Sequence, residues 1–357
     1  MVNLDVMENA NNWPAVLGKL LSKQALDRVE ADWAMTRIMA GDASDAQVGA
    51  FMLALRSKGE TVDELAGLVD VMLRNAVILD TGSDAVDIVG TGGDLVGTVN
   101  ISSMSAIVAA SAGVPVMKHG SRSASGKTGS SEMLEVLGIR LDLSPERVAD
   151  VFREVGITFF FAPVFHPAMR YVAPIRKELG VPTTFNFLGP LANPAQPIAT
   201  ALGVANREVA PLMAKEVANR GRSALVYRGL DGLDELSISG TSDIWQVAGG
   251  EVRHEVLNPT DLGIALAPLD ELIGGDAQHN AHVAKSLLEG EISGAILDSV
   301  RLNAASAIVA YELAKDPNKI EEPLVQRFDS AIQQVTEALE TGAAANKLSE
   351  WMAATQA

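Results

Sequence analysis

The chain has 357 residues, with 28 Lys and Arg against 45 Asp and Glu, which gives a formal net charge of −17. A hydrophobic content of 48% with only 20% charged residues excludes a disordered chain, because such chains lack the apolar surface to form a core. The acidic balance argues against nucleic-acid binding, which relies on clustered Lys and Arg. The lack of Cys excludes disulfides, a thiolate nucleophile and a Cys-ligated metal. The length predicts about two domains.

The longest apolar stretch, residues 106–117, is interrupted by Gly113 and Pro115 and is too short to span a bilayer. At the N-terminus the acidic Asp5 precedes the first basic residue, Lys19, which is not typical of a secretory signal. We therefore expect a cytoplasmic globular protein that is not associated with a membrane.

The first 80 residues predict helices. Ser44 with Gln47, and Thr61 with Glu64, fit capping boxes, in which two side chains satisfy free amides at a helix start. Behind the first cap, apolar residues from Val48 onward recur at i, i+3, i+4 and i+7, as on one face of a helix.

From Val86 onward, short β-branched runs alternate with helical segments, which predicts βαβ units and a largely parallel sheet. Ser144 and Pro145 open one of the helices, as cap and first helical residue. Helical spacing returns over residues 306–352. The runs expected to form strands are 86–89, 114–117, 158–161, 200–204 and 224–227.

The expected fold class is therefore α/β. We expect a small N-terminal helical domain plus a larger α/β domain with a mostly parallel central sheet flanked by helices. The helical domain is placed at residues 1–82, completed by helices from about 166–195, and the α/β domain at residues 83–357.

The segment 90–131 differs in composition from the rest, with eight Gly, nine Ser and three Thr among its 42 residues. Its turn at 90–94 follows a predicted strand, and residues 100–103 open a helix. Strand, Gly-rich turn and helix N-terminus together form an anion cradle of exposed amides. The sequence matches neither the Walker loop nor the dinucleotide fingerprint.

A second polar loop, residues 118–131, follows the next strand. Because loops after parallel strands meet at the carboxyl edge of the sheet, two such loops indicate a ligand with more than one phosphate. Asp234 and Glu235 follow a later strand. Adjacent carboxylates on a loop are usually solvated surface, but opposite a phosphate site they would hold Mg²⁺.

Further segments follow in chain order. The complete set of motifs, including those already described, is 90–94, 100–102, 118–120, 129–132, 161–163, 166–167, 185–194, 234–235 and 274–277 with Asn280. Together they resemble the anthranilate phosphoribosyltransferase family of tryptophan biosynthesis, from about Leu20 to the C-terminus. Each motif alone is weak, whereas all of them in order are highly specific.

The resemblance implies Mg²⁺-dependent transfer of a 5-phosphoribosyl group from phosphoribosyl pyrophosphate (PRPP) to the amine of anthranilate. The products would be N-(5-phosphoribosyl)anthranilate and pyrophosphate, and the enzyme would be a homodimer with PRPP on its α/β domain. The implied PRPP contacts are Gly90, Gly93, Asp94, Thr98, Asn100, Ile101, Ser102, Ser103, Lys118, His119, Gly120, Ser121, Arg122, Ser123, Ala124, Ser125, Gly126 and Ser130.

By the same resemblance, anthranilate would contact Gly90, Ser121 and Arg176. The implied Mg²⁺ ligands are Ser102, Asp234 and Glu235. No certain catalytic residue is implied, because a neutral aromatic amine attacks without a strong base. Lys118, Asp94 and the metal site would stabilise the transition state.

Three places depart from the family pattern: Ser121 replaces a usual Asn, Gly126 replaces a usual Ser, and residues 95–97 differ from the usual small and polar residues. Ser121 keeps open a phosphoribosyltransferase acting on another aromatic amine. Two further alternatives are a pyrimidine-nucleoside phosphorylase and a non-enzymatic nucleic-acid-binding paralogue. The pair Asp234-Glu235 favours a diphosphate donor over the first, and the acidic charge disfavours the second.

Overall fold

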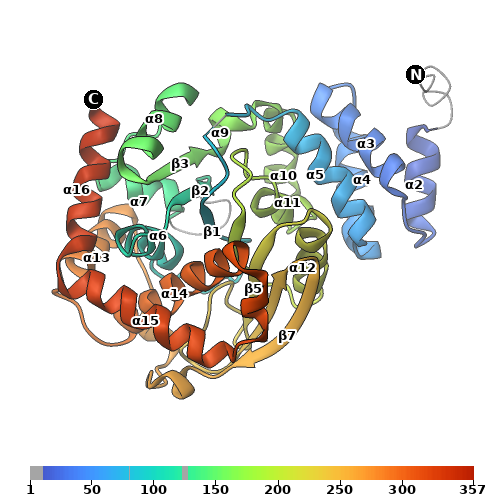
Figure 1. The fold of residues 1–357 in the computed structure, drawn as a ribbon. Helices are drawn as coiled ribbons and strands as arrows, with labels where there is room; N and C mark the ends of the chain where they lie inside the picture. Colours follow the sequence, from blue (N-terminus) through green and yellow to red (C-terminus); the bar gives the residue numbers. More distant parts are fainter. Residues whose placement is uncertain (1–10, 80, 123–127) are drawn as a thin grey trace.

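The computed structural model describes residues 11–79, 81–122 and 128–357, and its N-terminal part is helical, as predicted. The helices of this part are α2 (Trp13–Leu21), α3 (Arg28–Ala40), α4 (Asp45–Lys58) and α5 (Val62–Arg74). Ser44 caps α4 and Thr61 caps α5 through the two predicted capping boxes. Figure 1 shows these helices, in blue, as a lobe at one side of the molecule.

A seven-stranded sheet in the order β3-β2-β1-β4-β5-β6-β7 lies at the centre of the larger part. Its strands are β1 (Val86–Gly90), β2 (Val116–Gly120), β3 (Ile157–Phe161), β4 (Ala199–Gly203), β5 (Ser223–Gly229), β6 (Ser242–Ala248) and β7 (Glu251–Leu257). Neighbours from β3 to β5 are parallel, whereas β6 and β7 run antiparallel. All five predicted strands are present, and the predicted mostly parallel sheet is confirmed.

The hairpin of β6 and β7 is the part of the sheet that the sequence pattern did not predict. Asp243 and Gln246 interrupt the apolar pattern of β6, although both are buried. Gly249 and Gly250 form the turn, with φ of 57° and 82°. Such a pair in the left-handed region is typical of a two-residue hairpin turn, so this glycine pair was the available signal.

Helices cover both faces of the sheet, because alternate strand residues point to opposite sides. Val86 and Ile88 of β1 join a core with α6, α14, α15 and α16, whereas Val89 joins a core with α2–α5 and α12. The helices after β1 are α6 (Ile101–Ser111), α7 (Ser130–Val136), α8 (Pro145–Val155), α9 (Ala162–Phe165), α10 (Ala173–Leu179), α11 (Phe185–Leu191), α12 (Ala210–Asn219), α13 (Ala277–Leu288), α14 (Ala295–Lys315), α15 (Leu324–Glu340) and α16 (Ala343–Gln356). Short 3₁₀ helices are η1 (Pro167–Tyr171), η2 (Pro259–Leu262), η3 (Leu269–Leu272) and η4 (Pro317–Glu321).

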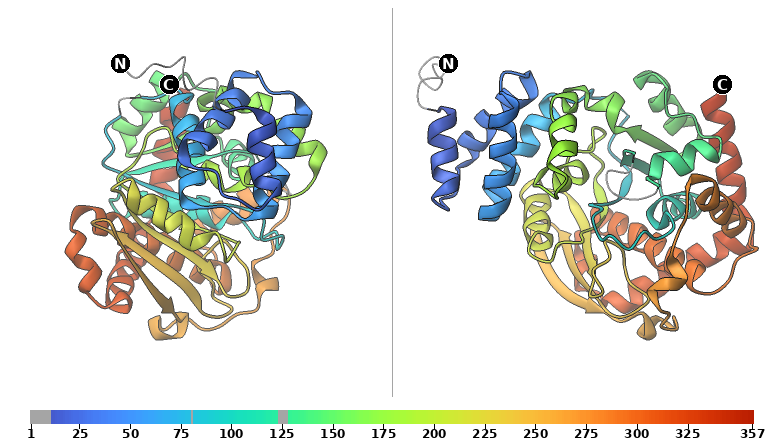
Figure 2. Two further views of the ribbon diagram at one scale, coloured as in Figure 1. Left: turned by 90° about the vertical axis from the view of Figure 1, so that its right-hand side faces the viewer. Right: turned by 180° about the vertical axis from the view of Figure 1, so that it is seen from behind.

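Segments from the middle of the chain lie against the N-terminal lobe. Contacts join η1 to α3, α10 to α4, and α11 to α5. Ile175 of α10 and Phe187 of α11 share a buried core with Phe51 and Met52 of α4. The right-hand view of Figure 2 shows green helices of the middle of the chain between the blue lobe and the larger part. Among the described residues, no helix combines the length and apolar character that a membrane crossing requires.

The strand order creates a switch point beside β1. The chain builds β2 and β3 on one side of β1 and then returns to place β4 on the other side. Gly90 and Gly203, the last residues of β1 and β4, lie in register with each other. In open α/β sheets, ligands bind outside the carboxyl ends of the strands at such a point.

Candidate active site

A cavity of about 570 Å³ opens at the carboxyl ends of β1 and β2, beside this switch point. The predicted site residues that line it are Gly90, Gly93, Asp94, Thr98, Asn100, Ile101, Ser102, Lys118, His119, Gly120, Ser121, Arg122, Ser130, Arg176, Asp234 and Glu235. Ser103 is instead buried within α6 and is not part of the lining. Ser123, Ala124, Ser125 and Gly126 lie outside the described residues.

The loop after β1 depends on glycine. Gly92, Gly93 and Gly97 have φ of 68°, 87° and 75°, in the left-handed region that side chains rarely adopt. Gly90 is required for a different reason, because a Cβ there would lie 2.2 Å from Oδ2 of Asp234. The end of β1 therefore approaches the Asp234 carboxylate more closely than any side chain would allow.

Asp234 and Glu235 form an acidic pair in the cavity wall. The N–H of Gly92 donates to Oδ2 of Asp234 at 2.7 Å, whereas Oε2 of Glu235 is buried and has no partner within the described part of the chain. Burial raises the pKa of both carboxyls well above the ordinary range. The charge of Asp94 raises the pKa of Asp234 further, and that of Asp234 raises the pKa of Glu235. Such a pair favours a proton or a cation.

A turn and a helix hold this acidic pair from both sides. Before it, Asp231 accepts hydrogen bonds from the N–H of Leu233, at 3.1 Å, and from the hydroxyl of Ser237. On the C-terminal side of the pair, the buried side chain of Asn303 on α14 forms two hydrogen bonds with the backbone of Leu236. It accepts from the N–H at 2.8 Å and donates to the carbonyl at 3.0 Å. The position of the two carboxylates is thus fixed by the fold and not by a mobile surface loop.

Lys118 of β2 supplies a buried ammonium group beside the acidic pair. It is 2% exposed and donates to the carbonyl of Ile88 and, at 3.3 Å, to the hydroxyl of Ser102. Burial lowers the pKa of Lys118, whereas the charges of Asp87 and of the acidic pair raise it. Because these carboxylates outnumber the single ammonium group, their ionisation leaves excess negative charge that a further cation would balance.

His119 places a neutral imidazole in the cavity wall. Its Nδ1 lies 3.2 Å from the carbonyl oxygen of Gly189 and donates there, so Nε2 is left as an acceptor. This Nε2 is buried and has no partner among the residues that the structure describes. Burial, and then the nearby His166, lower the pKa of His119 to about 3. The ring is therefore uncharged at neutral pH.

The backbone of His119 is held by a buried carboxylate beneath the cavity. Asp87 accepts from the N–H of His119 at 3.1 Å and from Nδ2 of Asn193 at 2.8 Å. Burial raises the pKa of Asp87 to about 6, although the charge of Lys118 opposes this shift. The carboxylate joins β1, β2 and the segment after α11, and so fixes how the two loops leave the sheet.

Arg176 of α10 places a guanidinium group on the cavity wall. Burial lowers the pKa of this group, and within the described residues no ion pair or hydrogen bond of its side chain is found. Phe185, Asn186 and Gly189 line the same cavity. From the sequence, the segment 185–194 is a family signature within the helices expected to complete the first domain, and none of its residues is predicted to line the site. The aromatic Phe185 and the amide Asn186, shortly after Arg176 in the chain, were the available signal for a wall that binds an aromatic acid.

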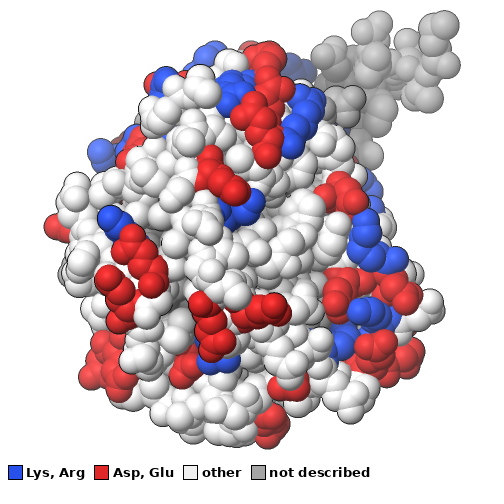
Figure 3. All heavy atoms as spheres, turned by 60° about the vertical axis from the view of Figure 1, so that its left-hand side comes forward, with Lys and Arg blue, Asp and Glu red and all other residues white. Residues whose placement is uncertain are grey.

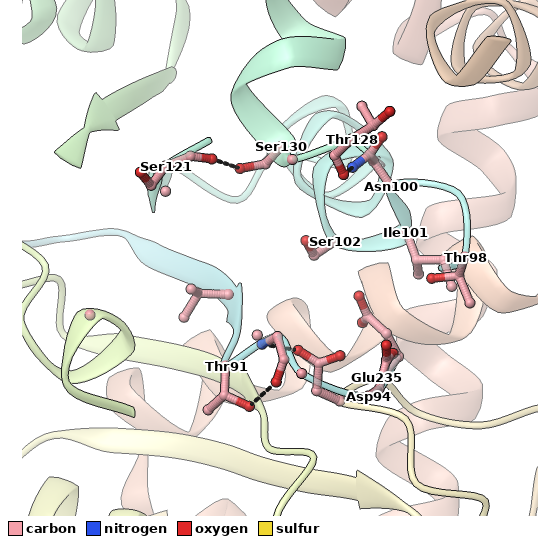
Figure 4. Close-up of a pocket in the computed structure, with 18 of the residues that line it drawn as sticks. Thr91, Asp94, Thr98, Asn100, Ile101, Ser102, Ser121, Thr128, Ser130 and Glu235 are labelled. Atoms are coloured by element: carbon pink, nitrogen blue, oxygen red, sulfur yellow. Dashed lines mark hydrogen bonds between the residues drawn. The ribbon is translucent and has the colours of Figure 1, made fainter. Parts of the chain in front are cut away.

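The two polar loops face each other across the cavity, as Figure 4 shows. Ser102, at the start of α6, points into the space between Ser121 and Ser130 on one side and Glu235 on the other. The Ser130 hydroxyl donates to the carbonyl of Ser121 at 3.4 Å. Asn100 precedes α6 without capping it through its side chain. The start of α6 therefore presents hydroxyls and amides to an anion.

Comparison with known proteins follows the same division into a helical and an α/β part. The glycosyl transferase family, helical bundle domain, matches residues 14–76, and the glycosyl transferase family, a/b domain, matches residues 82–345. An anthranilate phosphoribosyltransferase from Leifsonia xyli subsp. xyli is 52% identical over 350 residues, which cover 98% of this chain and 100% of the relative.

Solved structures agree with the relative. The crystal structure of anthranilate phosphoribosyltransferase from Thermus thermophilus superposes with a TM-score of 0.87 at 38% identity, covering 96% of this chain and 99% of that one. The Saccharomyces cerevisiae enzyme in complex with PRPP and Mg gives 0.86 at 27% identity, covering 96% and 98%. Sequence, fold and cavity therefore agree, and the chain belongs to the anthranilate phosphoribosyltransferase family.

Proposed function

We propose that this chain transfers the 5-phosphoribosyl group of PRPP to the amine of anthranilate, with Mg²⁺ bound, as a step of tryptophan biosynthesis. One observation carries the proposal. A single cavity holds an acidic pair with a free oxygen, a cradle of amides and hydroxyls, and an unpaired guanidinium group. These three features suit, in turn, the metal, the phosphates of the donor and the carboxylate of the acceptor.

The donor would lie on the two polar loops and the start of α6. We assign PRPP contacts to the predicted residues that line the cavity between Gly90 and Ser130. Their backbone N–H and hydroxyl groups are uncharged hydrogen-bond donors, and the ammonium group of Lys118 is a positively charged donor. Each hydrogen bond to a phosphate oxygen would contribute about 1.5–3 kcal/mol.

The acidic pair and Ser102 fit a Mg²⁺ ion. Oε2 of Glu235 is buried and has no partner among the described residues, and burial destabilises both ionised carboxylates. A divalent cation would bind this free oxygen and neutralise the negative charge of the pair. Mg²⁺ takes one or two protein carboxylates and completes its shell with water and phosphate oxygens. Within the described residues, no group of three or more His, Asp or Glu is placed to hold a metal ion, so the phosphates of PRPP would have to supply further ligands. When bound, Mg²⁺ would neutralise charge on the diphosphate.

The acceptor would be held by its carboxylate. Arg176 offers a planar guanidinium that suits a carboxylate in two parallel hydrogen bonds. Gly90 lets a ligand approach the end of β1, and Ser121 presents a hydroxyl at the cavity wall. The aromatic amine of anthranilate is neutral at pH 7, so it can attack without first losing a proton.

In the reaction, the amine nitrogen forms a bond to the anomeric carbon of the ribose. The bond from that carbon to the diphosphate oxygen breaks, its electron pair leaves with pyrophosphate, and the nitrogen then releases one proton. Lys118 and the amides of the loop after β1 would stabilise the negative charge that develops on the leaving group. Positioning of the two substrates in one cavity supplies the remaining rate enhancement.

A second acceptor is favoured by one residue. Ser121 has a shorter side chain than the Asn that the family usually carries at this position, and it is exposed at the cavity wall. Another aromatic amine with a carboxylate for Arg176 would fit the same site.

Nucleic acid is disfavoured as a ligand, because on the face drawn in Figure 3 the basic side chains lie in small groups beside acidic ones.

The test is to follow the fluorescence of anthranilate with purified protein, PRPP and Mg²⁺, with a metal-free control. Metal-dependent loss of fluorescence supports the proposal. No loss, with PRPP binding still measured by calorimetry, would retain the donor site and replace anthranilate by another amine. If PRPP also failed to bind, the proposed transferase function would be wrong.

We also propose a homodimer, a cytoplasmic location and a domain division at residues 1–82 and 83–357, with the helices from about 166–195 completing the first domain. The dimer is proposed from the family resemblance. Support for the division comes from the contacts of α10 and α11 with the N-terminal helices. Light scattering after size-exclusion chromatography measures the mass in solution, and a single-chain mass would contradict the dimer.

A further inference from the structure

The motif Gly274-Gly275-Asp276-Ala277 with Asn280 has no role in the site described so far. It forms the turn before α13 and the first residues of that helix, where Asp276 caps the helix by accepting from the N–H of His279 at 2.9 Å. Asn280 is only 1% exposed, and its side chain bonds to Asn100 at the edge of the cradle. A buried amide at this position needs an explanation, because burial of an unpaired amide is costly.

Four hydrogen bonds join this motif to both polar loops in a closed ring. Nδ2 of Asn280 donates to Oδ1 of Asn100 at 2.9 Å, and Nδ2 of Asn100 donates to the carbonyl of Thr128 at 3.4 Å. The hydroxyl of Thr128 donates to the carbonyl of Gly275 at 3.0 Å, and the N–H of Gly275 donates back to Oδ1 of Asn280 at 2.8 Å. Figure 4 shows the contact of Asn100 with Thr128 at the edge of the cavity.

The ring has one self-consistent direction. The N–H of Gly275 can only donate, so Asn280 must present its oxygen there and its NH₂ group to Asn100. Asn100 must then present its oxygen to Asn280, which turns its own NH₂ group to the carbonyl of Thr128. Each of the two amides therefore has its orientation fixed from outside by the backbone of another segment.

The turn before α13 is also tied directly to the loop after β1. The N–H of Gly274 donates to the carbonyl of Gly97 at 2.9 Å, and the N–H of Val99 donates to the carbonyl of Leu272 at 2.9 Å. A Cβ at Gly274 would lie 2.8 Å from both Oδ1 of Asn280 and the carbonyl of Thr98. The two segments are thus packed backbone to backbone, and the side chain of Asn280 fills the remaining space.

We propose that Asn280 is a positioning residue for the donor site: through this ring it sets the separation of the loop after β1 and the residues directly before α7, 128 and 129. The inference rests on the proposed function, because it assumes that PRPP binds between these loops. Asn280 is not among the residues that line the cavity. Its effect on PRPP therefore passes through Asn100 and Thr128, which do line it.

The test compares variants that open the ring from different sides. Asn280→Ala removes two of the four bonds, and Thr128→Val removes one while keeping the side-chain shape. We expect Asn280→Ala to raise the dissociation constant of PRPP, measured by calorimetry with Mg²⁺ present, by about tenfold. We expect the KM for anthranilate, measured at saturating PRPP, to change by less than about twofold, because Arg176, which would hold its carboxylate, lies on α10 and belongs to neither loop.

A matched control and a double variant separate positioning from stability. Ser105→Ala removes a buried hydrogen bond to the carbonyl of Val300, within the same α6 but away from the cavity, and should leave PRPP binding unchanged. If the ring acts as a unit, Asn280→Ala with Thr128→Val should weaken PRPP binding by less than the product of the single effects. The thermal unfolding midpoint of each variant shows whether it is folded. If Asn280→Ala does not fold, the Thr128→Val variant alone must show the selective loss of PRPP binding.

Equal changes in the PRPP and anthranilate constants would overturn the positioning role, and so would single effects that multiply in the double variant. Unaltered PRPP binding in a folded Asn280→Ala variant would overturn it as well. Failure of the parent protein to bind PRPP is a different result. It would refute the proposed function itself.

Discussion

Replacing Gly90 with Ala tests whether the acidic pair depends on the bare backbone at the end of β1. A Cβ there would lie 2.2 Å from Oδ2 of Asp234, whereas real Cβ atoms essentially never approach a heavy atom closer than 3.0 Å. The carboxylate must therefore move by about 0.8 Å, which perturbs the hydrogen bond that it accepts from the N–H of Gly92 at 2.7 Å. The added methyl group acts on the acidic pair directly.

The size of the effect follows from the hydrogen bond that is lost. A hydrogen bond to a charged acceptor contributes about 1.5–3 kcal/mol, which corresponds to about 10- to 150-fold in an equilibrium constant. We expect the Mg²⁺ concentration for half-maximal rate to rise within this range in Gly90→Ala. The unfolding midpoint should fall only slightly, because the methyl group displaces a side chain that faces the cavity and does not displace the core.

The assay follows anthranilate fluorescence over a series of Mg²⁺ concentrations at saturating PRPP. Gly240→Ala is the matched control, because its Cβ would meet no heavy atom within 4 Å and its φ is ordinary. An unchanged Mg²⁺ dependence in a folded Gly90→Ala variant would refute the reasoning. An equal shift in Gly240→Ala would show that the effect is not specific to Asp234.

Three further predictions concern the acceptor and the metal. Arg176→Ala should raise the KM for anthranilate by about 10- to 100-fold, since a charge-assisted pair is lost, and should change the KM for PRPP far less; equal changes would show that Arg176 does not serve the acceptor alone. Ser121→Asn should lower the KM for anthranilate by about two- to tenfold through one added hydrogen bond, and an unchanged KM would show the position to be neutral. Because the pKa values of Asp234 and Glu235 are raised by burial, the folded protein holds protons that the unfolded chain releases, so their contribution to stability falls as pH rises above the ordinary carboxyl range. Added Mg²⁺ should therefore raise the thermal unfolding midpoint more at pH 8 than at pH 6. The same measurement on the Asp234→Asn variant should show most of that difference removed.

Local signals explain why much of the fold could be predicted. The boxes at Ser44 and Thr61 and the cap at Ser144 act within one helical turn, so the sequence alone locates those helix starts, and all three caps form. The strand ends were less accurate. The run from Val114 forms a strand only from Val116, because pairing with Gly156 and β3, far away in sequence, decides where the ladder begins.

The candidate site was predictable only in part. Loops after successive strands could be placed at one edge of the sheet from sequence order, and the lining of the cavity confirms that Lys118 and Asp234 meet there. The anchors behind the site could not be predicted in this way. Asn303 and Asn193 reach the site's backbone and its buried carboxylate from distant parts of the chain, and no spacing rule encodes such contacts. Ser103 belongs to the same motif as Ser102 and was predicted to contact PRPP with it. Its side chain instead faces the core, because successive helical residues point in different directions.

The pairing of β1 has a consequence for how the protein folds. Val86 lies in register with Val116 on one side and with Ala199 on the other, so β1 is paired on both edges only by contacts between distant parts of the chain. Such non-local contacts require loops to close before any pairing stabilises them, which slows folding. The N-terminal helices, built from local contacts, should therefore form sooner than the sheet. Recovery of Mg²⁺-dependent activity after dilution from denaturant should lag behind recovery of helical circular dichroism, which makes activity a late reporter of refolding.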